Sequence, residues 1–196
     1  NEFCDTYEDY INYKKQVNGI RKTRNAIREK NINHETAVFM VYKAEYWDML
    51  DGLFREYEKR KEQEIVVIPL RYYYKNIDGT VEECASDAVL PEYVQKYINS
   101  DYNIEEENPE TIIIQNPYDG YNGSVTIHPR YYSKNLAIHT NKLIYMPYFV
   151  TEEINPMDMR AYISMDAYVT MPGVVYADEV MLQSEANKEL YIKKLT

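Results

Sequence analysis

The chain has 196 residues and a mass of 23.3 kDa, which suits one domain with an appended element better than two full domains. With 45% hydrophobic residues it can bury a core, while its net charge of −10 argues against non-specific binding to nucleic acid or an anionic membrane, because both need a basic surface. It has two cysteines, Cys4 and Cys84, and neither belongs to a CxxC pair, which excludes a disulfide framework and a paired-cysteine zinc or redox motif.

The first predicted unit is an N-terminal helix within residues 1–33. Apolar residues three or four positions apart predict a helix over residues 8–30, although Arg24 interrupts the pattern. They are Tyr10, Tyr13, Val17, Ile20 and Ile27. Two interpretations remain open: a helix packed on its own domain, which we favour, and a helix that pairs with a second copy in a homodimer.

Residues 34–196 show short apolar runs that alternate with helical stretches. The runs are continuous, as is typical of parallel strands covered on both faces. The predicted strands are residues 37–42, 65–69, 111–115, 142–147 and 179–183. Helices are predicted between the first two strands and over residues 103–108, 130–140 and 185–195, the last capped by Ser184. This order predicts an α/β fold, a Rossmann-like three-layer domain with a mainly parallel sheet of about five strands.

A stretch of forty residues, 71–110, separates the second and third predicted strands. Its start is typical of a hairpin that turns at Asp78-Gly79. Residues 76–120 hold eleven acidic residues and one base, Lys96, so the net charge of the whole chain is concentrated here. We expect a long, solvated acidic insertion. The alternative is a carboxylate cluster for a metal, but no ligand spacing is recognisable and we predict no metal.

Tyrosine recurs where the first four predicted strands end. Open parallel sheets bind ligands at this edge, and tyrosine combines a flat apolar ring with a hydrogen-bonding hydroxyl. The pattern therefore predicts a site for a sugar, a polyol or a nucleotide; the alternative is that the rings belong to the core. The predicted ligand-binding residues are Lys43, Arg71, Tyr72, Asn116, Tyr118, Tyr121, Arg130 and Tyr148.

The first strand lacks a glycine-rich phosphate loop, since VYKAEYWD contains neither GxGxxG nor GxxxxGK[ST]. This argues against an NAD-binding domain and a P-loop NTPase, and we predict no cofactor. We interpret His34 as a linker residue and His139 as a cation at a helix end. His128 stands near Arg130 just before a predicted helix, so it could hold a phosphate or transfer a proton; a structural role is the alternative.

Several motifs occur in a fixed order along about residues 36–190. They read YKAEYWDML, VVIPLRYYYKNIDGT, IIIQNPYDGYN, VTIHPRYYSKNL, LIYMPYFV and VVYADEVMLQSE. This order resembles the N-terminal half of CDP-glycerol glycerophosphotransferase-like proteins of Gram-positive bacteria, which are themselves similar to GT-B glycosyltransferases. The resemblance implies two Rossmann-like domains facing each other across a cleft, with the CDP-polyol donor mainly on the C-terminal domain and the acceptor mainly on the N-terminal one.

The resemblance implies that this chain is the acceptor-side half of such a transferase, in teichoic-acid or related cell-surface polymer synthesis. Its partners would be a polyol-phosphate or sugar acceptor and a C-terminal donor domain missing here. The last predicted helix runs to Thr196 without a glycine or proline stop, as in a cut chain. The acceptor side would be lined by Asn116, Tyr118, Asp119, Tyr121 and His128. His128 or Asp119 would be the catalytic base, and we expect no turnover by the chain alone.

Two alternatives from other functional classes remain open. One is a stand-alone domain that binds a sugar or nucleotide without catalysis. The other is an interaction module in which the helix over residues 8–30 and exposed tyrosines form a protein interface. The N-terminus lacks the apolar core of a secretory signal and no apolar run approaches ~18 residues, which predicts a cytoplasmic protein, peripheral to the inner membrane face only through parts outside this chain.

Overall fold

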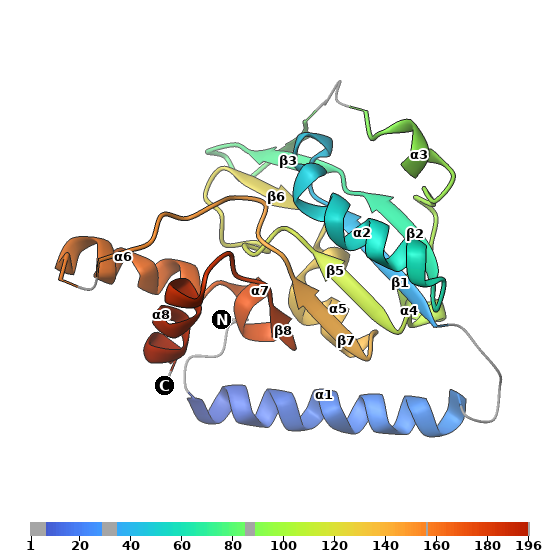
Figure 1. Ribbon diagram of the computed structural model, residues 1–196, viewed down its shortest axis with the longest axis horizontal. Helices are drawn as coiled ribbons and strands as arrows, with labels where there is room; N and C mark the ends of the chain where they lie inside the picture. The colour runs from blue at the N-terminus through green and yellow to red at the C-terminus, as the bar shows by residue number, and fades with distance from the viewer. Residues whose placement is uncertain (1–6, 29–34, 85–88, 156, 196) are drawn as a thin grey trace.

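A five-stranded parallel sheet forms the centre of the computed structural model, which describes residues 7–28, 35–84, 89–155 and 157–195 (Figure 1). The spatial order of the strands is β2-β1-β5-β7-β8, and every neighbouring pair is parallel. The strands are β1 (Thr36–Val41), β2 (Glu64–Pro69), β5 (Thr111–Ile114), β7 (Lys142–Tyr145) and β8 (Glu179–Val180). The predicted parallel α/β fold with about five strands is confirmed.

Residues 97–99 extend the sheet beyond β2. The Val67 amide donates to the Tyr97 carbonyl oxygen at 2.8 Å, and the Asn99 amide donates to the Val67 carbonyl oxygen at 3.0 Å, in a parallel arrangement. When this short edge is counted, the spatial order of the six segments along the chain becomes 3-2-1-4-5-6, the order of doubly wound Rossmann sheets. The stretch 71–110 is therefore partly a strand crossover and not only an insertion.

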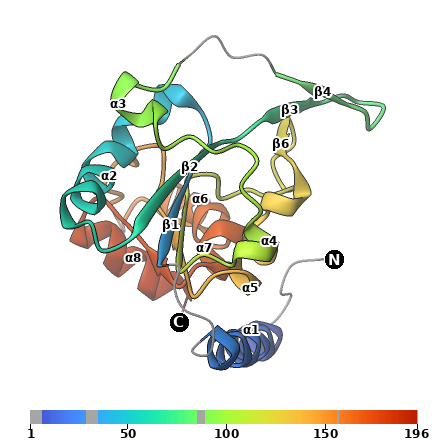
Figure 2. The ribbon, with the colours of Figure 1, turned by 90° about the vertical axis from the view of Figure 1, so that its right-hand side faces the viewer.

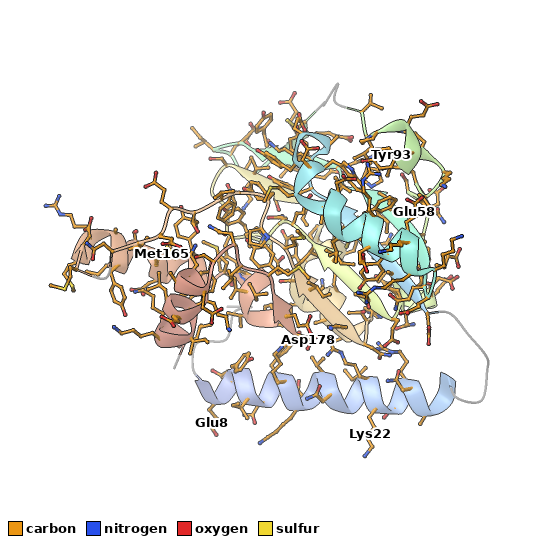
Figure 3. The ribbon with its side chains drawn as sticks, viewed as in Figure 1. Glu8, Lys22, Glu58, Tyr93, Met165 and Asp178 are labelled. Atoms are coloured by element: carbon orange, nitrogen blue, oxygen red, sulfur yellow. The ribbon has the colours of Figure 1, made fainter. Side chains whose placement is uncertain are left out.

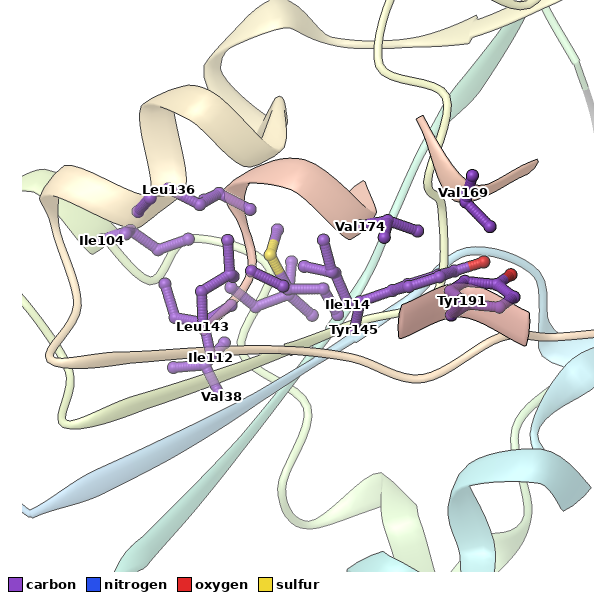
Figure 4. Close-up of a cluster of buried hydrophobic side chains, with 14 of the residues drawn as sticks. Val38, Ile104, Ile112, Ile114, Leu136, Leu143, Tyr145, Val169, Val174 and Tyr191 are labelled. Carbon is purple, nitrogen blue, oxygen red and sulfur yellow. The ribbon is translucent and has the colours of Figure 1, made fainter. Parts of the chain in front are cut away.

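Helices cover both faces of the main sheet and make three layers. One face packs against α2 and α3. Phe54 of α2 and Val94 of α3 lie in one buried cluster with Phe39 of β1. The other face packs against α4 to α8, and Figure 4 shows this second core, a cluster that includes Val38 and Leu143 of the sheet and Leu136 of α5. Because the strands are buried on both faces, they read as continuous apolar runs. The helices are α2 (Asp48–Arg60), α3 (Glu92–Gln95), α4 (Ile104–Glu107), α5 (Ser133–Ile138), α6 (Met159–Val169), α7 (Pro172–Tyr176) and α8 (Glu185–Leu195).

The predicted cap of the last helix is confirmed, since Ser184 Oγ accepts a hydrogen bond from the Asn187 amide at 3.1 Å. The sequence patterns did not predict α3, α6 and α7. Two of these three helices are five residues or shorter, so they carry too little of the 3.6-residue period to be recognised.

A second, antiparallel sheet starts at the carboxyl end of β2. It contains β3 (Tyr72–Lys75), β4 (Val81–Glu83) and β6 (Val125–Ile127) in the order β4-β3-β6. Figure 2 shows its hairpin extending away from the main sheet. The predicted turn is confirmed: Gly79 has a φ of 85°, and its amide donates to the Asn76 carbonyl oxygen at 3.0 Å. The acidic side chains of Glu82 and Glu83 are exposed on β4, as expected for a solvated segment.

The helix α1 (Tyr7–Arg28) lies along the outer side of α5 and α7 (Figure 1). Val17 is buried, and the Tyr13 ring packs edge-on against the Tyr176 ring with centroids 4.6 Å apart. The helix therefore packs on its own domain, as the favoured interpretation has it, while Ile20 stays 47% exposed and pairing with a second copy stays a prediction. Figure 3 shows Glu8 and Lys22 pointing away from the domain.

The helices of the described ranges include none with both the length and the apolar composition that crossing a membrane requires. Cys4 and His34 lie outside the described residues.

Cations of α1 bind carbonyl groups at the ends of α5 and α7. Lys14 Nζ donates to the Ala177 carbonyl oxygen at 2.9 Å, and Arg21 Nη2 donates to the Ala137 carbonyl oxygen at 3.0 Å. Arg21 also donates to both carboxylate oxygens of Asp178, at 2.8 and 2.9 Å. Positive charge at helix C-termini is favourable, so these contacts dock α1 electrostatically as well as through Val17.

Candidate functional site

Loops that leave β1, β2, β5 and β7 bring five tyrosines together at the carboxyl edge of the main sheet. We call this group the tyrosine rim; it consists of Tyr42, Tyr46, Tyr72, Tyr118 and Tyr148. Tyr46, in the 3₁₀ helix η1 (Ala44–Tyr46), stacks on Tyr148 with centroids 4.6 Å apart. The ring centroid of Tyr42 lies 5.3 Å from that of Tyr148 and 5.9 Å from that of Tyr72, and both distances are favourable for aromatic pairs.

Lys43 places a positive charge on the tyrosine rim. Its Nζ lies 4.5 Å from the ring centroid of Tyr72 and 5.5 Å from that of Tyr42. These cation–π contacts hold the ammonium group over the rings. The predicted residues Lys43, Tyr72, Tyr118 and Tyr148 are thus brought together at one edge of the sheet.

The hydroxyl groups of Tyr42, Tyr72 and Tyr148 are neutral at physiological pH. Burial raises the pKa of Tyr42 to about 12. A hydrogen bond with the Cys84 thiol, together with burial, raises the pKa of Tyr72 to about 12. Burial and a hydrogen bond with Tyr118 raise the pKa of Tyr148 as well. These phenols can donate and accept hydrogen bonds, but they do not supply a base.

Gln115 connects two loops of the tyrosine rim, and the sequence patterns did not identify it. It is fully buried at the end of β5, beside β1, where the strand order of the sheet reverses. Its Oε1 accepts from the Tyr42 amide at 3.2 Å, and its Nε2 donates to the Tyr46 carbonyl oxygen at 3.0 Å. A carboxamide directly after a buried strand is the signal that could have indicated it.

A cavity of about 560 Å³, which we call the rim cavity, opens beside the tyrosine rim. Tyr118 and Tyr148 form part of its wall, and the unpredicted helix α6 forms another part through Met165 and Tyr168. Asp158 caps this helix by accepting from two backbone amides at 3.1 Å. A capping aspartate before apolar residues at helical spacing is the signal that could have predicted α6.

Two predicted residues have structural roles in the loop after β5. Asp119 is 4% exposed, and its carboxylate accepts from the Ser133 amide at 2.9 and 3.0 Å and from Ser133 Oγ at 2.7 Å. Asn116 is buried, and its Oδ1 accepts from the Tyr118 amide at 3.1 Å. In this structure Asp119 therefore caps the start of α5 and Asn116 shapes the loop, and their predicted roles in a site stay predictions.

Three other predicted residues contact groups outside the tyrosine rim or line another cavity. His128 is exposed and its Nδ1 accepts from the Arg130 amide at 3.2 Å, which caps the 3₁₀ helix η2 (Pro129–Tyr131). Arg71 is exposed, and its Nη1 lies 3.5 Å from Oε2 of Glu83 on the hairpin, as an ion pair. Tyr121 is 55% exposed and lines a separate cavity. Tyr121 and Tyr118, which the sequence predicts to share one site, thus line different cavities.

His139 ends α5, as predicted, but not as a cation. Burial lowers its pKa below the usual value, and repulsion by Arg24 adds to this in spite of the attraction of Glu105. The imidazole is therefore neutral at pH 7. Residues 7–28, 35–84, 89–155 and 157–195 contain no group of three or more His, Cys, Asp or Glu side chains that could hold a metal ion.

Comparison with protein-family models, with curated proteins and with solved structures gives no match to this chain.

Proposed function

We propose that this domain binds the polyol or sugar portion of a phosphorylated ligand at the tyrosine rim, as the acceptor side of a GT-B-type transferase in teichoic-acid or related cell-surface polymer synthesis. The observation that carries the proposal is the stacked pair of Tyr46 and Tyr148 beside the Lys43 ammonium, at the carboxyl edge of a parallel sheet. Ligands of open α/β sheets bind at this edge, where the strand order reverses.

The chemistry of the tyrosine rim suits such a ligand. The rings of Tyr46 and Tyr148, which are only half-buried, offer flat apolar contact to carbon–hydrogen groups, and phenol hydroxyls can both donate to and accept from ligand hydroxyls. Lys43 adds a cation that can contact a phosphate group. Gln115 fixes the backbone at Tyr42 and Tyr46, which lowers the entropy lost on binding.

The proposal assigns binding, and not the chemical step, to the tyrosine rim. With Asp119 committed to Ser133, His128 is the predicted residue that remains for proton transfer. The activated donor would be bound by a second domain. The alternative function, a sugar-binding domain without catalysis, requires the same contacts at the tyrosine rim.

Chemical-shift mapping with sn-glycerol 3-phosphate tests the proposal. We expect saturable shifts of the backbone amides of Lys43, Tyr118 and Tyr148. Lys43→Gln should weaken them because the cation is lost. Tyr97→Phe is a control, since Tyr97 packs against a different core cluster from Tyr148 of the tyrosine rim and its hydroxyl donates to Glu58 of α2 at 2.8 Å. Absence of saturable shifts at the tyrosine rim would refute the proposal.

A further inference from the structure

A second cavity lies on the other side of the loop that follows β5. It has a volume of about 460 Å³, and we call it the η2 cavity. Its walls include Gly120, Tyr121, Pro129, Tyr132, Asn135 and Pro172. It shares no residue with the rim cavity, although Tyr118 of the rim cavity and residues 119–121 of the η2 cavity are consecutive in the loop.

The loop that lines the η2 cavity is fixed from several sides. Lys75 Nζ of β3 donates to the Gly120 carbonyl oxygen at 2.6 Å and to the Asn122 carbonyl oxygen at 2.8 Å. Asp119 is bound to Ser133 of α5 and adopts a left-handed backbone with a φ of 49°. An uncommon backbone conformation that is held by its surroundings is frequent at binding sites. The cavity is therefore formed before any ligand arrives.

The side chains around the η2 cavity are also oriented by the protein. The Tyr132 hydroxyl lies 3.0 Å from Thr126 Oγ1. Asn135 Nδ2 donates to the Pro129 carbonyl oxygen at 2.8 Å, which fixes the carboxamide at the edge of the cavity. Tyr121, at 55% exposure, presents a large aromatic surface at the opening. An exposed aromatic ring next to a fixed carboxamide combines apolar contact with directed hydrogen bonds.

The charge of the η2 cavity distinguishes it from the tyrosine rim. One acidic residue, Asp119, and one basic residue, Lys134, line it, so its walls carry no net charge. Proline rings at Pro129 and Pro172 add rigid apolar surface. This lining favours an uncharged ligand with one apolar face and hydroxyl groups at its edge.

We infer that the η2 cavity is a second ligand site, separate from the tyrosine rim, and that it binds an uncharged pyranose sugar. The sugar ring lies against Tyr121 and the prolines, and its hydroxyls bond to Asn135 and Tyr132. This inference does not depend on the proposed function, because no residue of the tyrosine rim takes part in it.

Two glycines of the same loop provide a matched pair of variants. A Cβ atom at Gly120 would lie 3.0 Å from the Tyr132 hydroxyl oxygen, so Gly120→Ala adds a methyl group to the cavity wall. A Cβ atom at Gly123 would meet nothing within 4 Å, so Gly123→Ala leaves the cavity unchanged. Tyr121→Ala removes an exposed ring and is the second test variant if Gly120→Ala impairs folding.

The experiment is an NMR titration of the full chain with methyl α-glucopyranoside. We expect saturable amide shifts at Gly120, Tyr121 and Asn135, about tenfold weaker affinity in Gly120→Ala and in Tyr121→Ala, and unchanged affinity in Gly123→Ala. Lys43→Gln should leave this binding intact, which separates it from the tyrosine rim. Absence of saturable shifts in the unchanged chain, or an affinity of Tyr121→Ala equal to that of the unchanged chain, would overturn the inference.

Discussion

The carboxylate of Asp178, just before β8, connects α1 to β7. It accepts two hydrogen bonds from Arg21 of α1 and one from the Leu143 amide of β7, at 2.8 to 2.9 Å. Burial alone would raise its pKa, but these hydrogen bonds and the charges of Arg21 and Lys14 outweigh burial and hold the pKa below its usual range. The ionised carboxylate is therefore stabilised in the folded protein.

Replacing Asp178 by Asn should lower the free energy of unfolding by about 1–3 kcal/mol at pH 7, because Arg21 loses its charged partner. Since the pKa is depressed on folding, this stabilisation is present above the unfolded value of ~3.9 and is lost as the pH falls through the folded pKa. Urea unfolding between pH 7 and pH 3 measures both effects.

Glu56→Gln is the control for this experiment, because Glu56 forms an exposed pair with Arg60 and should change stability little. Equal stability of Asp178→Asn and the unchanged protein at pH 7 would contradict the role given to Asp178.

At the scale of elements, the start of α7 packs tightly on the loop after β5. The Gly173 amide donates to the Pro117 carbonyl oxygen at 2.8 Å. A Cβ atom at Gly173 would lie 2.6 Å from Pro117 Cα, which is backbone and cannot turn away. This close contact places α7 against the loop that carries residues of both cavities.

Gly173→Ala should therefore destabilise the protein by about 1–3 kcal/mol, since the added methyl group overlaps with a packed backbone. Gly52→Ala is the matched control. Gly52 lies exposed inside α2 with nothing within 4 Å of an added Cβ, so this change should stabilise by about 0.5–1 kcal/mol. Thermal and urea unfolding measure both variants, and a neutral or stabilising Gly173→Ala would show that the loop can move.

The central strands could be predicted from sequence because nearly all of their residues are buried. Strands β1, β5 and β7 are covered on both faces and appear as unbroken apolar runs. The edge at residues 97–99 and the strand β6 are three residues long, too short for any period to be visible.

The site could be predicted only in part. Parallel strands direct their carboxyl ends to one edge, so the gathering of Tyr42, Tyr72 and Tyr148 follows from strand positions alone. The partners of Asp119 do not follow, because they depend on a left-handed residue in a turn and on Ser133 fourteen positions later. Such long-range loop contacts leave no periodic signal in the sequence.

At the scale of the whole molecule, charge is distributed unevenly over the described residues. Acidic residues gather on the hairpin and on α4, where Glu82, Glu83 and Glu105 are exposed. The tyrosine rim instead carries the Lys43 ammonium over its rings. An anionic ligand would therefore be attracted to the tyrosine rim and repelled by the hairpin, more strongly at low ionic strength.

The most direct measurement is calorimetric titration of sn-glycerol 3-phosphate into the full chain and two variants. We predict that Lys43→Gln binds about tenfold more weakly, a loss of about 1.4 kcal/mol, while Tyr97→Phe binds as the unchanged protein does. Equal affinity in all three proteins, or no measurable binding by the unchanged chain, would contradict the claim that the tyrosine rim is the ligand site.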